Sequence, residues 1–125
     1  AYENDVVIAQ YCVEHPDITH ADARQLFQDL LAWLWLSAKL REQQFTSHMI
    51  APLAHLDEMW HVFILHTRHY VEFCQQYFQR YLHHEVISIH QEAVWNTDEL
   101  SAYLHQCCDE LGMDWVQRNF AALLQ

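Results

Sequence analysis

Residues 55–70 read His55-Leu-Asp-Glu-Met-Trp-His61-Val-Phe-Ile-Leu-His66-Thr-Arg-His69-Tyr70, and this run predicts a helix. It contains no glycine or proline, and its histidines, carboxylates and aromatic residues recur at intervals of three and four. Pro52 suits the first turn of such a helix. We therefore expect one long, His-rich central helix from about Pro52 to Tyr81, roughly 45 Å long at about 1.5 Å per residue.

Helices are also expected on both sides of this run. The sequence has one Gly and two Pro, too few for the many turns of a β-rich fold. The other predicted helices run from about Asp5 to Glu14, from after Thr19 to about Glu42, from Asn96 or Thr97 to Gly112, and onward from after Asp114. Residues 86–90, Val-Ile-Ser-Ile-His, are compatible with a short extended piece. The predicted fold class is all-α, a compact single-domain bundle of about five helices over residues 1–125.

The charge balance argues against two classes of partner. Seventeen acidic and six basic residues give a formal net charge of −11. Nucleic acid and anionic membrane surfaces both attract clustered Lys and Arg, which this chain lacks. The apolar run from Leu30 to Leu36 is far too short to span a bilayer. We expect no nucleic-acid partner and no membrane, while a homodimer or a protein partner stays open.

The cysteines and the start of the chain predict a cytoplasmic protein. The four cysteines have no CxxC spacing and form no dense disulfide framework. They fit packed, reduced thiols in the cytosol. The start, Ala1-Tyr-Glu-Asn-Asp5, is polar and acidic, unlike a signal peptide.

Histidines are the strongest functional signal. The chain has eleven, and seven of them lie within residues 48–84. Imidazole is the commonest metal ligand and the side chain that normally changes charge near neutral pH. On a helix, Asp57 shares a face with His61 at the i, i+4 spacing, and Glu58 does so at i, i+3. Asp57, Glu58 and His61 are therefore the favoured ligand group.

Two kinds of metal site fit this spacing. Glu-x-x-His is found in helical di-iron sites, but those need a second copy and two further glutamates. No second copy occurs in the chain, so only a dimer would complete the di-iron site of an oxidase. A mononuclear site for Zn²⁺, Fe²⁺ or Cu²⁺ needs only a carboxylate, one or two imidazoles from this helix, and a histidine from elsewhere.

His83 and His84 form a second candidate group, which distance sets apart. His61 and His83 are 22 residues apart, and a straight helix would separate them by roughly 30 Å. They ligate one ion only if the helix breaks or a second subunit contributes. His69 is closer to His83, and His48 could fold back toward the start of the helix. We therefore expect two separate groups of candidate ligands.

The same run resembles a known family. Residues 56–74, Leu-Asp-Glu-Met-Trp-His-Val-Phe-Ile-Leu-His-Thr-Arg-His-Tyr-Val-Glu-Phe-Cys, followed by Tyr77-Phe78 and His83-His84, are similar to the signature of the glycine-rich domain-containing protein-like family. Its members are small bacterial proteins, and longer plant proteins carry a related module. The resemblance covers this run closely and the upstream helix more loosely. It implies an all-helical fold and no particular reaction.

The resemblance marks particular positions. Carried over position by position, it identifies as signature residues Asp57, Glu58, Trp60, His61, Thr67, Tyr70, Cys74, His83 and His84. Two positions depart from the family's pattern, because Phe63 stands where many relatives have His and Gln79 where many have Gly. His66 and His69 are particular to this chain. The resemblance therefore ranks His61 above the more conspicuous His66 and His69.

These observations lead to three hypotheses. The preferred one is a small soluble metal-binding protein, extending to a metalloenzyme, with a carboxylate and histidine site on the central helix and Zn, Fe or Cu as its metal. In the second, the chain is a non-catalytic interaction module in which Asp57, Trp60 and His61 form a structural polar network. In the third, a dimer completes a di-iron-like oxidase. Whether the chain is an enzyme stays open.

Overall fold

The structure is a computed structural model that describes residues 2–42, 51–84 and 97–121. These residues form helices joined by turns and short connections, with no strand among them. The elements are α1 (Asp5–Glu14), α2 (His20–Glu42), the short 3-10 helix η1 (Ala51–Leu53), α3 (Ala54–Leu65), α4 (Thr67–Phe78), α5 (Thr97–Leu111) and α6 (Met113–Asn119). The predicted all-α class is confirmed for the described part of the chain. His48 and the extended piece predicted at residues 86–90 lie outside it.

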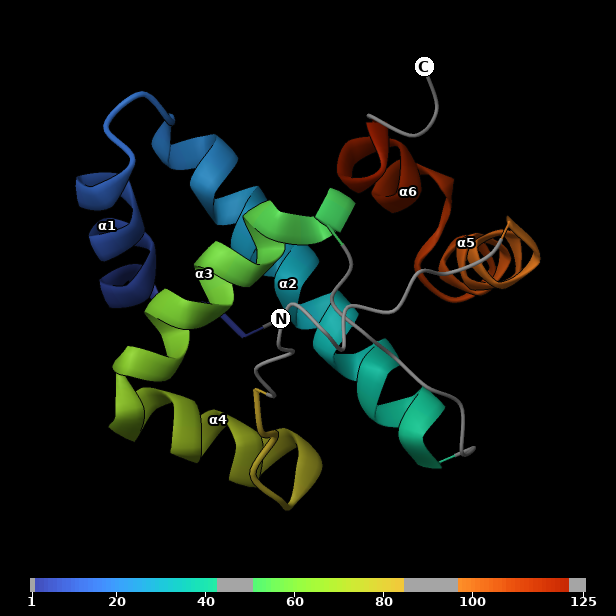
Figure 1. The fold of residues 1–125 in the computed structure, drawn as a ribbon. Coiled ribbons are helices and arrows are strands. Elements are labelled where there is room, and N and C mark those ends of the chain that lie inside the picture. Colours follow the sequence, from blue (N-terminus) through green and yellow to red (C-terminus); the bar gives the residue numbers. More distant parts are fainter. Residues whose placement is uncertain (1, 43–50, 85–96, 122–125) are drawn as a thin grey trace, which may run out of the picture.

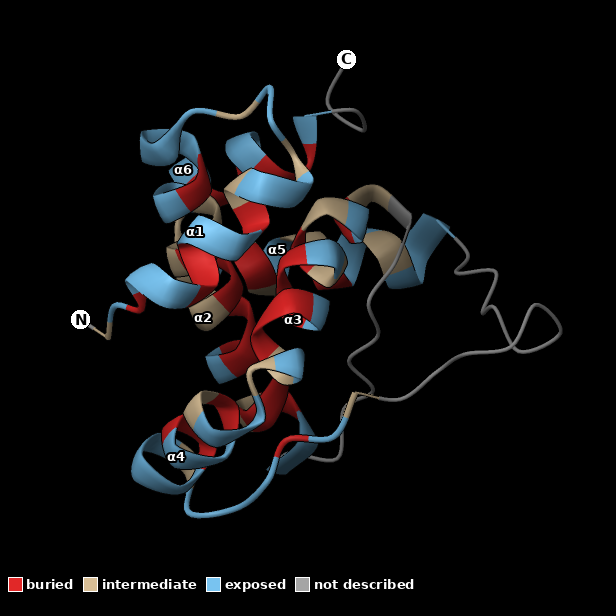
Figure 2. Cartoon of the chain, turned by 90° about the vertical axis from the view of Figure 1, so that its left-hand side faces the viewer, coloured by how far each residue is buried: buried red, intermediate tan, exposed pale blue. Residues whose placement is uncertain are grey.

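α2 is the central helix of the bundle. It packs against α1, α3 and α5, and in Figure 1 it runs diagonally, with α1 and α4 on one side and α5 and α6 on the other. Phe27 of α2 meets Phe63 of α3 edge-on, with ring centroids 5.2 Å apart. Figure 2 shows the buried faces of α2 and α3 turned to the interior. None of the helices described combines enough length with enough apolar sequence to traverse a bilayer.

Local capping explains where α1 and α2 begin and end. Asn4 precedes α1, and its side-chain oxygen accepts a hydrogen bond of 3.2 Å from a backbone N–H of the first turn. α1 ends at Glu14, because Pro16 disfavours the α conformation in the residue before it. Thr19 Oγ1 accepts from Asp22 N at 3.1 Å and starts α2. These boundaries agree with the prediction from sequence.

The predicted single helix from Pro52 to Tyr81 is wrong, because the chain bends at His66. This residue has φ −85° and ψ 67°, outside helical values, and it separates α3 from α4. Its backbone N–H bonds Phe63 O at 3.1 Å, whereas an unbroken helix would use Val62 O, four residues back. The His66 imidazole Nδ1 donates to Val62 O at 2.8 Å instead. A side chain thus replaces the backbone hydrogen bond that the bend removes.

The bend and the end of α4 bring the chain back toward α3 (Figure 1). α4 ends at Phe78, and Gln79 adopts a left-handed backbone with φ 55°. Glycine takes this conformation at no steric cost, and glycine is the residue that the family resemblance implies at this position. The following residues return far enough for the Leu82 side chain to be buried in the core.

α6 is joined to α2 by a buried carboxylate. The Asp29 side chain is 6% exposed and accepts four hydrogen bonds of 2.9–3.1 Å, two from Arg118, one from Asn119 and one from Gln25. Asn119 Oδ1 in turn accepts from His55 of α3 at 2.8 Å. We call Asp29, Gln25, Arg118 and Asn119 the Asp29 network. It holds the last described helix against the centre of the bundle.

Candidate metal centre

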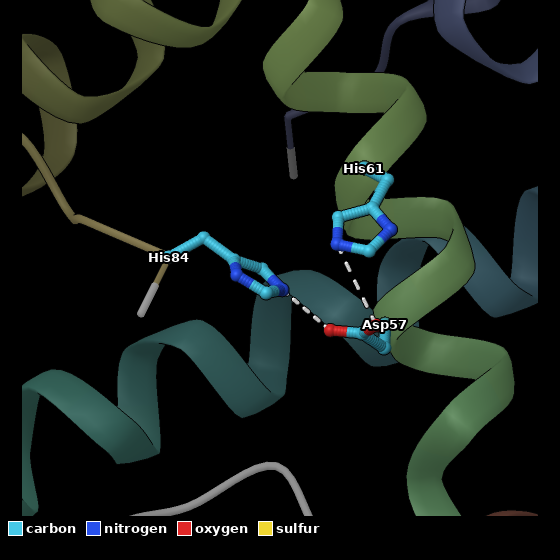
Figure 3. Close-up of side chains that lie close together, drawn as sticks. All are labelled: Asp57, His61 and His84. Carbon is cyan, nitrogen blue, oxygen red and sulfur yellow. Dashed lines mark hydrogen bonds and ion pairs between the residues drawn. The ribbon is translucent and has the colours of Figure 1, made fainter. Parts of the chain in front are cut away.

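Three side chains that can ligate a metal converge at one place (Figure 3). Asp57 and His61 project from α3, and His84 faces them from the segment after α4. One ligand atom from each residue lies within 4.8 Å of the other two. His84 Nε2 donates to Asp57 Oδ1 at 2.5 Å, and His61 Nε2 lies 3.6 Å from Asp57 Oδ2. We call these three residues the Asp–His–His cluster.

The periodicity of α3 places two of the three residues. Asp57 and His61 are one helical turn apart, so their side chains lie on the same face. Met59 and Trp60 lie between them in the sequence and are buried, which fixes the rotation of the helix. The face that carries Asp57 and His61 is thereby directed away from the core.

Exposure differs across the cluster. The side chain of His61 is 55% exposed, that of Asp57 28% and that of His84 16%. The His84 ring is confined by the rings of Trp60 and His61, with centroids 4.4 and 4.5 Å away. The cluster therefore has a sheltered imidazole, a carboxylate, and an outer imidazole that faces solvent.

The distances can be compared with those around a bound metal. With ligand bonds of about 2.1 Å, neighbouring ligand atoms in a tetrahedral site lie about 3.4 Å apart. The distance of 3.6 Å between His61 and Asp57 is close to that value. The distance of 2.5 Å between His84 and Asp57 is shorter because a proton lies between the two atoms. A metal would replace this proton and separate the pair by about 1 Å.

Leu82 fixes the segment that carries His84. Tyr70 Oη donates to Leu82 O at 2.5 Å, and Trp60 Nε1 donates to Tyr70 Oη at 3.1 Å. Burial raises the pKa of Tyr70, so its hydroxyl keeps the proton that it donates. His84 follows Leu82 by two residues, and its backbone position is set by this contact.

Cys74 contacts the same backbone. Burial raises the pKa of the Cys74 thiol, and hydrogen bonds with the Leu82 backbone and the Tyr70 side chain oppose part of that rise. Tyr70 thus bonds Leu82 O, and the Cys74 thiol lies beside the Leu82 backbone. We call Trp60, Tyr70, Cys74 and Leu82 the Leu82 anchor.

The sequence did not assign a role to this anchor. One hypothesis from the sequence placed Trp60 in a structural polar network with Asp57 and His61. Tyr70 and Cys74 were recognised as signature positions, and Leu82 was not singled out. The signal was present in the spacing of Tyr70 and Cys74, which share a face of α4 at i, i+4. Their common target lies across a turn, which spacing alone does not reveal.

Two other predicted ligands lie outside the cluster. Glu58 Oε2 pairs with His15 Nε2 at 3.1 Å and links α3 to the end of α1. His83 packs against Tyr81, with ring centroids 4.7 Å apart. The predicted ligands that the structure brings together are Asp57, His61 and His84.

The prediction of two separate ligand groups is wrong. The expected separation of roughly 30 Å between His61 and the His83–His84 pair assumed a straight helix, and the bend at His66 removes that assumption. The rings of His61 and His84 lie 4.5 Å apart. One cluster therefore draws on both predicted groups.

The most conspicuous histidines have structural partners. His66 makes the bend between α3 and α4. His69 Nδ1 accepts a hydrogen bond from Asn4 Nδ2 at 2.8 Å, which ties α4 to the start of α1. His66 and His69 are therefore not members of the Asp–His–His cluster.

The chain matches a family over almost its whole length. The family is described as UCP032817-like, and the match extends over residues 3–124. No curated protein and no solved structure matches the chain. All the described helices lie inside the matched range, and so do the Asp–His–His cluster and the Leu82 anchor. The chain therefore belongs to the UCP032817-like family.

Proposed function

We propose that the protein binds one divalent transition-metal ion through Asp57, His61 and His84. The observation that carries the proposal is the convergence of three ligand atoms within 4.8 Å of one another, from two separate segments. One carboxylate and two imidazoles form the donor set of many mononuclear Fe²⁺ sites, and three such protein ligands also suit Zn²⁺. Cu²⁺ accepts the same imidazole and oxygen ligands.

The exposure of the cluster suits chemistry as well as binding. Three protein ligands leave at least one coordination position for water or a substrate. The solvent-facing side at His61 gives access to that position. We therefore extend the proposal to a metalloenzyme, and we assign no reaction to it.

The experiment that tests the proposal compares two adjacent histidines. Protein purified without a His tag and stripped of metal is titrated with Zn²⁺, Cu²⁺ and, without oxygen, Fe²⁺. His84→Ala is expected to weaken binding by more than about 100-fold, because losing an outer partner of a ligand already costs about 10- to 100-fold. His83→Ala is the matched control, and its affinity is expected to stay within about threefold of wild type.

Two results would contradict the proposal. One is a wild-type protein that binds far less than one equivalent of each metal and shows no rise in melting temperature with any of them. The other is an equal loss of affinity in His83→Ala and His84→Ala. Glu58→Gln serves as a second control, since Glu58 pairs with His15 and not with the cluster.

The second candidate is an interaction module in which the cluster is a structural polar network. The 2.5 Å hydrogen bond from His84 to Asp57 favours it, because this bond ties the segment after α4 to α3. Stability measured in chelator separates the two candidates. The network is supported if His84→Ala lowers the free energy of unfolding by more than about 1 kcal/mol while the wild type binds no metal.

The remaining expectations stay predictions. A di-iron site completed by a dimer requires a dimer in solution, and a strictly monomeric protein in light scattering would contradict it. The cytoplasmic location, the absence of nucleic-acid partners and the resemblance to the glycine-rich domain-containing protein-like family are likewise carried by the sequence alone.

A further inference from the structure

The Tyr70 hydroxyl links the core to the segment that supplies the third ligand, through its hydrogen bond to Leu82 O. Tyr70 is fully buried. Its oxygen accepts from Trp60 Nε1, so its own proton is directed to Leu82 O, 2.5 Å away. The hydroxyl donates its one proton to Leu82 O and accepts from Trp60, so the direction of these two bonds is fixed.

Fixing Leu82 confines His84. Consecutive residues advance the chain by at most about 3.6 Å each, so the His84 backbone lies within about 7 Å of the anchored residue. No helix holds His84, since α4 ends at Phe78. The exposed Tyr81 on the other side of Leu82 gives the segment little further burial. The Leu82 anchor thus constrains the His84 backbone, while Asp57, Trp60 and His61 contact the His84 ring itself.

Trp60 acts at two points of the same arrangement. Its indole N–H orients the Tyr70 hydroxyl, and its ring packs against the His84 ring at 4.4 Å. Trp60 is also one residue before His61 on α3, so the residue that orients the anchor belongs to the helix that carries the other two ligands. α3 therefore contributes one residue to the anchor and two to the cluster.

We infer that Tyr70 and Trp60 are positioning residues that hold His84 in the geometry needed to complete a three-ligand metal site with Asp57 and His61. This inference rests on the proposed metal binding and adds to it how the third ligand is kept in place. When a group that orients a metal ligand without touching the metal is lost, metal affinity typically falls by about 10- to 100-fold. Tyr70→Phe is therefore expected to bind Zn²⁺ about 10- to 100-fold more weakly than wild type.

A second Trp–Tyr pair in the same protein provides a matched control. Trp33 Nε1 donates to Tyr103 Oη at 2.8 Å, and both side chains are buried. This pair joins α2 to α5 and involves neither Leu82 nor His84. Tyr103→Phe removes the same hydroxyl and also leaves a buried indole N–H without that acceptor. It is expected to lower stability as Tyr70→Phe does, while its Zn²⁺ affinity stays within about threefold of wild type.

The test measures metal affinity and coordination together. Zn²⁺ affinity is obtained by competition with a coloured chelator, at a temperature where circular dichroism shows every variant folded. The visible spectrum of the Co²⁺ form reports the number of ligands. We expect the Tyr70→Phe spectrum to shift toward that of His84→Ala and the Tyr103→Phe spectrum to match wild type. Wild-type affinity and spectrum in Tyr70→Phe would overturn the inference.

A measurement without metal separates this inference from the proposed function. The imidazole ¹⁵N and ¹H signals of His84 report its hydrogen bond to Asp57, and Asp57→Ala supplies the reference for its loss. If the wild type binds no metal but Tyr70→Phe still loses this bond, the metal proposal fails and the positioning role stands. If metal binds and neither signal responds to Tyr70→Phe, the positioning role fails alone.

A further variant covers the case in which Tyr70→Phe does not fold. Cys74→Ala removes the thiol beside the Leu82 backbone and leaves the Tyr70 bond to Leu82 O in place. It is expected to weaken Zn²⁺ binding by about threefold to tenfold, less than Tyr70→Phe. Unchanged affinity in a folded Cys74→Ala protein, together with an unchanged His84 signal, would overturn the role of the anchor.

Discussion

The carboxylates of Asp29 and Asp57 differ in the groups that surround them. Asp29 is almost fully buried and accepts hydrogen bonds from Arg118, Asn119 and Gln25, none of which is a usual metal ligand. Asp57 is partly exposed, and the nitrogens near it belong to two imidazoles. Both residues lie on helices of the same core.

The difference shows how a structural carboxylate can be distinguished from a candidate ligand. The donors around Asp29 keep their protons at all ordinary pH values, so its oxygens have no lone pair left to offer a metal. The imidazoles around Asp57 can exchange a proton for a metal ion. Burial alone would have favoured Asp29 as the candidate metal ligand. The chemistry of the hydrogen-bond partners favours Asp57 instead.

The largest expected effect is on stability and comes from the Asp29 network. Asp29→Ala leaves Arg118, Asn119 and Gln25 without their common acceptor, and we expect a loss of about 3 kcal/mol in the free energy of unfolding. Asp57→Asn, measured in chelator, is expected to cost less than about 1 kcal/mol, because the residue is partly exposed. Urea denaturation of the two variants gives both values.

Metal affinity is expected to show the reverse order. At a temperature where the protein is folded, Asp29→Ala should bind Zn²⁺ as wild type does, and Asp57→Asn should bind it more than about 100-fold more weakly. Equal stability losses in chelator for the two variants would remove the distinction between the two carboxylates.

The next effect concerns two buried thiols, Cys74 on α4 and Cys107 on α5. Cys74 contacts the segment that carries His84, and Cys107 is buried on α5. Zn²⁺ at about 100 times its dissociation constant should slow alkylation of Cys74 by iodoacetamide by up to about 100-fold, because metal bound through His84 would stabilise the folded state in which the thiol is buried. Cys107 should react at an unchanged rate, with mass spectrometry of the two peptides as the readout. Equal slowing of Cys74 in His84→Ala would show that Zn²⁺ acts on the thiol directly.

The same thiols make stability depend on alkaline pH. Burial raises the pKa of Cys74 and raises that of Cys107 to about 12, whereas an unfolded thiol ionises near about 8.5. The raised values favour the folded, protonated forms, so their contribution is complete below about pH 8.5 and is lost as pH rises further. Urea denaturation at pH 8, 9 and 10 should show a falling free energy of unfolding, by at most about 1.4 kcal/mol per pH unit for each thiol.

The last effects concern the two residues with positive φ, one before the segment that carries His84 and one before α6. Gly112 has φ 93° at the joint between α5 and α6, and Gln79 has φ 55° before the segment of His84. An added Cβ at Gly112 meets nothing within 4 Å, but its φ of 93° and ψ of 159° are essentially restricted to glycine, so Gly112→Ala should cost the backbone strain, about 1–3 kcal/mol. Gln79→Gly should stabilise the protein by about 0.5–1 kcal/mol, because glycine relieves that strain. Thermal denaturation measures both, and a destabilised Gln79→Gly would contradict the assigned strain.

The parts of the fold that depend on neighbouring residues were predictable from the sequence. The caps at Asn4 and Thr19 and the stop at Pro16 act over a few residues, and they place α1 and α2 correctly. Gly112 marks the end of α5 for the same reason. The bend at His66 was missed because no glycine or proline marks it. It depends on an imidazole that replaces a backbone bond, and the sequence alone gives no sign of that.

In the candidate site too, contacts within one helical turn were predictable from the sequence, and contacts between distant segments were not. Asp57 and His61 were paired correctly in the sequence because both lie on one helical turn. His84 was named but not distinguished from His83, since the distinction depends on the bend and on the Leu82 anchor. Asp29 was overlooked, although a carboxylate inside the apolar stretch of α2 is itself a signal of a buried partner.

The hydrogen bond at the His66 bend has a consequence for acid conditions. The bond uses Nδ1–H, and imidazole carries a proton on Nδ1 in this tautomer as well as in its cationic form. Protonation at Nε2 therefore leaves the bend intact. The imidazoles of the Asp–His–His cluster, in contrast, would ligate a metal only through a nitrogen that carries no proton, because ligation needs that nitrogen's lone pair. If the cluster binds a metal as proposed, acid is therefore expected to weaken that binding while the His66 bend keeps its hydrogen bond.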